Sequence, residues 1–166
     1  MPEEVASSIV QKDPSYQLID VRNADEFAKF SLPGAINIPL ESIMNEENID
    51  LLNQDVKTNI FYSNGSLQAN EAWMLTRQLG YKNNYVLMGG LNYWVESIMN
   101  PQKPSSVSSD EEMAKYNYQK AAGRALGSDP SAINSDSSSV IQTNTVKSTV
   151  PKTESKKKKK VSGGCS

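Results

Sequence analysis

Short apolar segments that alternate with helical patterns constrain the fold of this chain more than any other feature. Four such segments are predicted to be strands, and they span residues 17–21, 35–38, 59–62 and 84–87. Helical signals separate them, including a capping position at Asn23 and a helix over residues 69–79 that Gly80 is placed to end. Strands joined through helical crossovers run parallel, with helices on both faces of the sheet. The sequence therefore predicts one α/β domain with a small, mostly parallel sheet, whose third strand is central.

Further helices are predicted around these strands. Pro2, followed by two acidic residues, is typical of the first turn of a helix. Phe27 and Phe30 are expected to face inward from the helix that Asn23 begins. Residues 40–52 are predicted to form a helix with an acidic surface, and residues 93–98 a helix that ends before a proline.

The composition changes after residue 104. Residues 1–101 are predicted to form the domain, residues 102–126 a linker with a helix capped by Ser109, and residues 127–166 a disordered tail. This tail is rich in Ser, Asn and Thr and ends in five lysines followed by Val-Ser-Gly-Gly-Cys-Ser. Residues 1–104 carry a net charge of −6 and residues 105–166 a net charge of +4. An acidic body argues against a nucleic-acid groove, which would need a basic face.

Cysteine and histidine usage excludes several kinds of site. The chain has one cysteine, Cys165, and no histidine, which rules out a Cys/His zinc site and Ser–His or Cys–His catalysis. No metal or cofactor is predicted. No apolar run is long enough to span a bilayer and no signal pattern is present, so a cytoplasmic location is expected. The first predicted helix begins almost at Met1, and an additional upstream anchor would instead make the protein membrane-associated.

Four segments together resemble, in order and spacing, the rhodanese (sulfurtransferase) domain. They are Leu18-Ile19-Asp20-Val21-Arg22 with Glu26-Phe27, Leu32-Pro33-Gly34-Ala35-Ile36-Asn37-Ile38-Pro39, the stretch from Phe61 to Leu79, and Gly80-Tyr81 through Gly89-Gly90 to Trp94. This resemblance covers about residues 3–99. It implies the parallel α/β fold and a functional loop after the third strand.

In that loop the chain departs from the family. Active rhodanese domains resemble one another in a cysteine that follows the third strand, where backbone N–H groups lower the thiol pKa from about 8.5 and the thiolate accepts sulfur. Here Ser63 stands at that position, and Gln68 replaces the basic residue that many active loops carry. Without a histidine, Ser63 is a poor nucleophile. The backbone N–H groups remain a candidate anion-binding loop, formed by Ser63, Asn64, Gly65, Ser66, Leu67, Gln68 and Ala69.

Several residues near this loop are interpreted as structural. Asp20 and Arg22, at the end of the first predicted strand, are expected to form a buried ion pair, with Arg22–Glu26 as the alternative pair. A structural ion pair is favoured over a substrate contact. Gly89 and Gly90 allow a tight turn beneath the loop, and Trp94 is assigned to the core.

The sequence leaves three functions open. The first is a catalytically inactive binding or accessory module in sulfur handling or regulation, with a protein partner. The second is a sulfurtransferase or sulfur carrier in which the tail thiol of Cys165 accepts sulfur from a donor protein. The third is a membrane-adjacent scaffold, in which the lysine run binds anionic lipid weakly. The lysines of that run are Lys156, Lys157, Lys158, Lys159 and Lys160. A solvated charge run without a role is the commonest meaning of such a segment.

Overall fold

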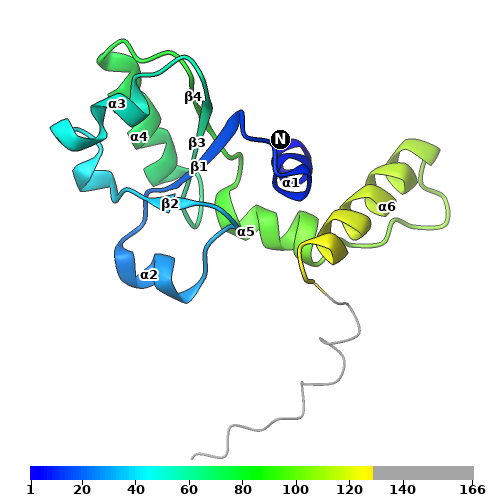
Figure 1. Ribbon diagram of the computed structural model, residues 1–166. Coiled ribbons are helices and arrows are strands. Elements are labelled where there is room, and N and C mark those ends of the chain that lie inside the picture. The colour runs from blue at the N-terminus through cyan, green and yellow to red at the C-terminus, as the bar shows by residue number, and fades with distance from the viewer. Residues whose placement is uncertain (129–166) are drawn as a thin grey trace, which may run out of the picture.

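A four-stranded parallel sheet forms the centre of the computed structural model, which describes residues 1–128 (Figure 1). Its strands are β1 (Tyr16–Asp20), β2 (Ile36–Asn37), β3 (Thr58–Tyr62) and β4 (Asn84–Val86). They lie in the order β2-β1-β3-β4, and every neighbouring pair is parallel. The predicted α/β class is confirmed, and β3 is an interior strand as predicted. The predicted tail, with its lysine run and Cys165, lies outside the described residues.

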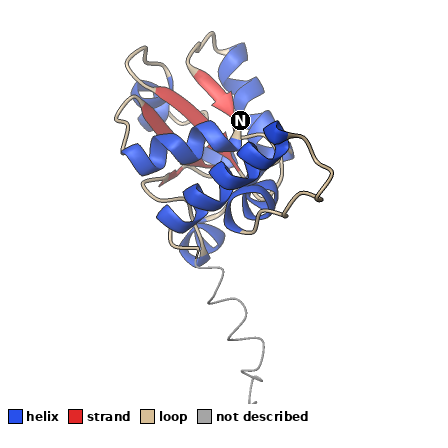
Figure 2. Ribbon diagram, turned by 90° about the vertical axis from the view of Figure 1, so that its right-hand side faces the viewer, coloured by secondary structure: helices blue, strands red, loops and turns tan. Residues whose placement is uncertain are grey.

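Helices cover both faces of this sheet (Figures 1 and 2). They are α1 (Pro2–Gln11), α2 (Ala24–Lys29), α3 (Ile49–Leu52), α4 (Leu67–Gln78), α5 (Gly90–Trp94) and α6 (Asp110–Ala125). Successive strand residues point to opposite faces, so Leu18 and Ile60 join a cluster with residues of α1, α5 and α6. Ile19 and Phe61 join the other cluster, with residues of α4 and of the segment between β2 and β3. Each face of the sheet therefore carries its own apolar core.

The helix predicted over residues 40–52 is wrong. This segment forms two short 3₁₀ turns, η1 (Leu40–Ser42) and η2 (Glu46–Asn48), before the single turn of α3. Asn48 donates from Nδ2 to the carbonyl oxygen of Ser42 at 2.8 Å. Asparagine side chains that bond nearby backbone groups compete with continuous helix.

The inward orientation predicted for Phe30 is also wrong, because its side chain is 44% exposed. Helix α2 ends at Lys29, and Phe30 has an extended backbone with φ −160° and ψ 131°. Asn23 does cap this helix as predicted, accepting a hydrogen bond from the Glu26 N–H at 2.9 Å. Since α2 buries none of its own residues, its cap and its loop contacts hold it in place.

Helix α6 packs against α1 and forms the predicted helix after residue 102. Ser109 and Glu112 form a reciprocal capping box at its start. On its inner side, Gln119 donates from Nε2 to Glu3 Oε1 at 2.8 Å and Tyr118 donates to the Glu3 carbonyl oxygen at 3.0 Å. Among the helices of residues 1–128, none is both long and apolar enough to cross a bilayer.

Candidate functional site

The loop between β3 and α4 lies at the carboxyl end of the sheet, where parallel α/β folds bind their ligands. Helix α4 begins at Leu67, two residues before the predicted start. Residues 63–66 therefore form the loop, and Leu67, Gln68 and Ala69 form the first helical turn. Of these three, Leu67 and Gln68 are exposed and Ala69 is buried. The predicted loop thus contains both a tight turn and a helix start.

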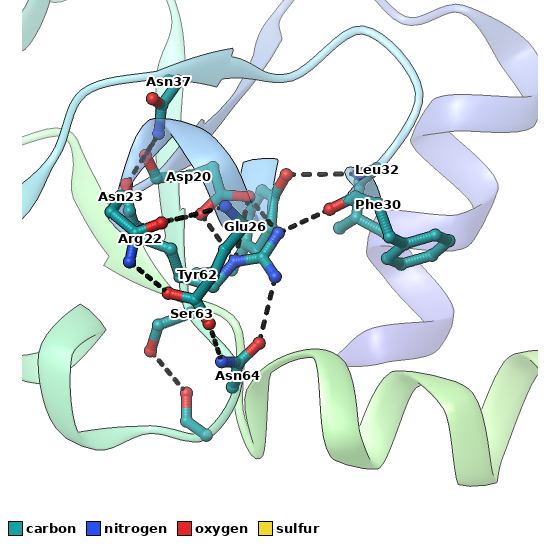
Figure 3. Close-up of polar contacts among 11 residues, drawn as sticks. Asp20, Arg22, Asn23, Glu26, Phe30, Leu32, Asn37, Tyr62, Ser63 and Asn64 are labelled. Carbon is teal, nitrogen blue, oxygen red and sulfur yellow. Dashed lines mark hydrogen bonds and ion pairs between the residues drawn. The ribbon is translucent and has the colours of Figure 1, made fainter. Parts of the chain in front are cut away.

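Ser63 closes this loop. Its hydroxyl donates to the carbonyl oxygen of Gly65 at 2.8 Å (Figure 3), and the residue is 1% exposed. Its own carbonyl oxygen accepts from the N–H of Leu91 at 2.9 Å, at the start of α5. A hydroxyl without an adjacent base is a weak nucleophile. Here the hydroxyl proton is also engaged in the hydrogen bond to the Gly65 carbonyl oxygen.

The backbone donors and acceptors of the loop are used unequally. The carbonyl oxygen of Asn64 accepts from the N–H of Asn92 at 2.9 Å, and that of Ser66 accepts from the N–H of Asn70 at 2.9 Å. By contrast, within residues 1–128 the backbone N–H groups of residues 64–69 donate to no protein acceptor. These donors are the groups that the predicted anion cradle requires, and anion binding stays a prediction.

Asp20 and Arg22 form the buried ion pair beside the loop. Arg22 donates from Nη2 to Asp20 Oδ2 at 2.6 Å and from Nε to Asp20 Oδ1 at 3.0 Å. Both side chains are buried. The hydrogen bond to Asp20 raises the pKa of Arg22 further above its ordinary value, despite the opposing effect of burial. Of the two predicted pairs, the structure thus contains Asp20–Arg22.

Arg22 also holds two other segments. Its Nη2 donates to the carbonyl oxygen of Phe30 at 2.6 Å, and its Nη1 donates to Asn64 Oδ1 at 3.0 Å. Asn64 in turn donates from Nδ2 to Glu26 Oε1 at 2.6 Å (Figure 3). An amide can accept and donate at once, so Asn64 joins the arginine to the carboxylate of Glu26. Glu26 therefore contacts the loop without pairing with Arg22.

Sequence reasoning missed Asn64 as a bridge and two further residues of this network. Asn37, at the end of β2, donates to the carbonyl oxygens of Asp20 at 3.0 Å and Arg22 at 2.8 Å. The hydroxyl of Tyr62 accepts from the N–H of Leu32 at 3.1 Å, and burial raises the pKa of Tyr62. Polar groups at the carboxyl ends of predicted strands are the signal that could have identified both residues.

Gly89 and Gly90 form the turn beneath the loop, with φ +74° and +59°. A Cβ atom on Gly90 would lie 2.3 Å from the carbonyl oxygen of Gly65 and 2.5 Å from that of Ser63. The N–H of Gly89 donates to the Ser66 hydroxyl at 3.0 Å. Trp94 lies in the core at 1% exposure. The two glycines therefore let the α5 turn approach the loop backbone.

Among residues 1–128, no group of three or more histidine, cysteine, aspartate or glutamate side chains is placed to hold a metal ion. Cys165, the other candidate nucleophile from the sequence, lies outside the described residues. The side chains gathered at the loop are thus hydrogen-bonded amides, hydroxyls and one ion pair.

Comparisons with known proteins identify relatives of this chain. The thiosulfate:glutathione sulfurtransferase of Saccharomyces cerevisiae is 28% identical over 103 residues, which are 56% of this chain and 74% of that protein. The adenylyltransferase and sulfurtransferase UBA4 of Meyerozyma guilliermondii is 30% identical over 95 residues, 52% of this chain but 22% of that protein. The chain therefore spans less than a quarter of this second relative.

A solved structure shows the same fold. The rhodanese-like domain of an Anabaena protein superposes with a TM-score of 0.50 at 21% identity, covering 65% of this chain and 85% of the domain. The model of the family described as the rhodanese-like domain matches residues 1–97. With more than half of its length matched, the chain belongs to the rhodanese-like domain family.

Proposed function

We propose that this protein is a catalytically inactive rhodanese-like module that binds a protein partner at the carboxyl end of its sheet, where the Ser63 loop lies. One observation carries the proposal. The residue at the position of the family's cysteine is Ser63, which is buried and donates a hydrogen bond from its hydroxyl to the Gly65 carbonyl oxygen. A thiolate accepts sulfur to form a persulfide, and a serine hydroxyl does not. The chain has no histidine that could activate this hydroxyl.

A set of exposed apolar side chains around the loop supports partner binding. Each follows a different strand, and the set, here called the apolar rim, consists of Phe30 at 44%, Met44 at 56%, Leu67 at 81% and Met88 at 50% exposure. All four lie in segments that follow the carboxyl ends of the strands, and the proposal takes them as the apolar part of an interaction site, since contiguous exposed apolar patches typically mark such sites. Aromatic residues and methionine are also enriched in such interfaces.

The relatives support a role in sulfur handling. The yeast relative that this chain covers to 74% is named for sulfur transfer from thiosulfate to glutathione. The proposed partner is accordingly a protein that donates, accepts or responds to persulfide sulfur. In this proposal the loop contributes a rigid recognition surface, held by the Arg22–Asn64–Glu26 hydrogen bonds.

The full chain is expected to transfer no sulfur from thiosulfate to glutathione or cyanide above the rate without protein. The reason is that Ser63 cannot form the persulfide intermediate. The measurement is a sulfurtransferase assay of the full chain and of its Cys165→Ser variant. Turnover that persists in Cys165→Ser would contradict the proposal. Turnover that disappears in Cys165→Ser would instead favour the tail thiol as a sulfur carrier.

Leu67→Asp is expected to abolish partner binding, because it places a carboxylate at the most exposed residue of the apolar rim. Val56→Asp is a matched control, since Val56 is 85% exposed and Leu67 81%. Val56 precedes β3 and therefore lies at the amino end of the sheet, away from the Ser63 loop. Proteins that co-purify with the tagged full chain from its own cells are quantified by mass spectrometry. A partner lost with Leu67→Asp and retained with Val56→Asp is the expected result. Equal binding by both variants would contradict a partner site at this edge.

A further inference from the structure

A groove lined by both acidic and apolar side chains lies beside the Ser63 loop. It has a volume of about 530 Å³, and its lining includes Leu40, Met44 and Leu75 together with Gln68 from the first turn of α4. Glu41 and Glu71 are the charged residues of this lining. We call it the acidic groove. It joins the loop region to the segment between β2 and β3.

The carboxylates of this groove form no ion pair in the described part of the chain. Glu41 and Glu71 are both exposed, and neither takes part in an ion pair within residues 1–128. The segment between β2 and β3 adds Glu46, Glu47, Asp50 and Asp55, with no lysine or arginine before Lys57. Figure 1 shows this segment and α4 on the same side of the sheet. The groove therefore favours a cationic occupant with aliphatic stems that can lie along its floor.

The chain itself supplies such a segment. Residues 147–160 contain 7 lysines and 1 glutamate, whereas residues 1–128 carry a net charge of −6. The 27 residues between Ser128 and Lys156 reach up to about 90 Å when fully extended. A body of 128 residues has a radius of gyration of about 14 Å. A segment on this tether meets the groove at an effective concentration in the millimolar range.

We propose that the lysine run of residues 156–160 binds in the acidic groove of its own chain. The ammonium groups would face Glu41 and Glu71, and the lysine stems would cover Leu40 and Met44. Residues 161–165 span at most about 17 Å, so the bound run would hold Cys165 close to the Ser63 loop. Because Met44 belongs to both the acidic groove and the apolar rim, the run would also compete with a partner, and only this consequence rests on the proposed function.

The single cysteine of the chain allows a direct test. A nitroxide spin label on Cys165 of the ¹⁵N-labelled full chain marks only the end of the tail. At low ionic strength, paramagnetic broadening is expected at the amides of residues 40–44 and 67–71. It should disappear in about 0.5 M NaCl, where the Debye length is about 4 Å. The Glu41→Gln/Glu71→Gln variant should lose it at low salt.

A control of equal charge separates this site from general attraction. Glu96→Gln/Glu111→Gln removes two exposed carboxylates that do not line the groove, and it should retain the broadening. Broadening that is spread evenly over the surface, or that is reduced equally in both variants, would overturn the proposal. So would broadening of the same extent in a mixture of spin-labelled ¹⁴N chains with unlabelled ¹⁵N chains, because the contact would then lie between two molecules. These outcomes are independent of any sulfurtransferase result.

Discussion

Replacing Asp20 with alanine is expected to lower the free energy of unfolding by about 3–5 kcal/mol, the usual effect of removing one partner from a buried ion pair. The substitution leaves the Arg22 guanidinium buried without its carboxylate, although Arg22 is only 4% exposed. It also removes the acceptor for the Arg22 backbone N–H, which lies 3.0 Å from Asp20 Oδ1. Equilibrium unfolding in urea measures this change. Since small domains are stable by only about 5–15 kcal/mol, such a loss removes a large fraction of the total stability.

Asp25→Ala is the matched control for this prediction. Asp25 is an exposed acid in the first turn of α2, where its interaction with the helix dipole contributes about 0.3–1 kcal/mol. Equal losses in the two variants would show that the buried pair contributes no more than a surface carboxylate. A loss confined to Asp20→Ala should be accompanied by chemical-shift changes at Asn64. Such changes would show that the ion pair determines the geometry of the Ser63 loop.

Much of the fold could be predicted because its determinants are local. The predicted strands are recognisable because strands covered on both faces are nearly continuous in apolar residues. Asn23 and Ser109 could be predicted as caps because Asn and Ser favour this position. In the structure each accepts a hydrogen bond from the N–H three residues later. Gly80 could be placed just after α4 because its φ of +85° is suited to glycine.

The errors arise where distant contacts override local preference. Helix α4 begins earlier than predicted, and the Ser66 hydroxyl does not cap it because it accepts from the N–H of Gly89. Phe30 reads as a core residue by its spacing, but its backbone is extended and its carbonyl oxygen is held by Arg22. Gly89 lies 23 positions from Ser66 and Arg22 lies 8 positions from Phe30, and the local helical pattern shows neither contact.

The candidate site shows the same division between local and distant contacts. The Asp20–Arg22 pair was foreseeable from two charged residues at the end of one strand. The role of Asn64 was not, because its contacts with Arg22 and Glu26 join residues 42 and 38 positions apart. Because these contacts are distant in sequence, the sequence alone could not decide between an Asp20–Arg22 pair and an Arg22–Glu26 pair. Asn64 occupies the position between Arg22 and Glu26 that a direct contact would need.

Gly90→Ala is expected to lower the free energy of unfolding by about 3 kcal/mol. A left-handed backbone conformation costs a residue with a Cβ atom about 1–2 kcal/mol, and Gly90 has φ +59°. Steric overlap adds about 1–3 kcal/mol, because the new Cβ atom would lie 2.3 Å from the Gly65 carbonyl oxygen. Backbone atoms cannot rotate away as a side chain can, so the loop itself must shift. Urea unfolding gives the energy, and the amide shifts of residues 63–66 report the displacement.

Gly34→Ala separates the two causes, since Gly34 has φ +76° but no atom within 4 Å of the point where a Cβ atom would lie. This control should lose only the conformational part, about 1–2 kcal/mol, and leave the loop amides unchanged. Equal losses in the two variants would mean that the loop moves aside at little cost and that the turn does not define its shape. A larger loss for Gly90→Ala, with shifts at Ser63 and Gly65, would mean that α5 fixes the loop from below. The packing of α5 against the loop would then hold the Ser63 hydroxyl in its hydrogen bond to the Gly65 carbonyl oxygen. A loop fixed in this way would present a rigid surface to a partner.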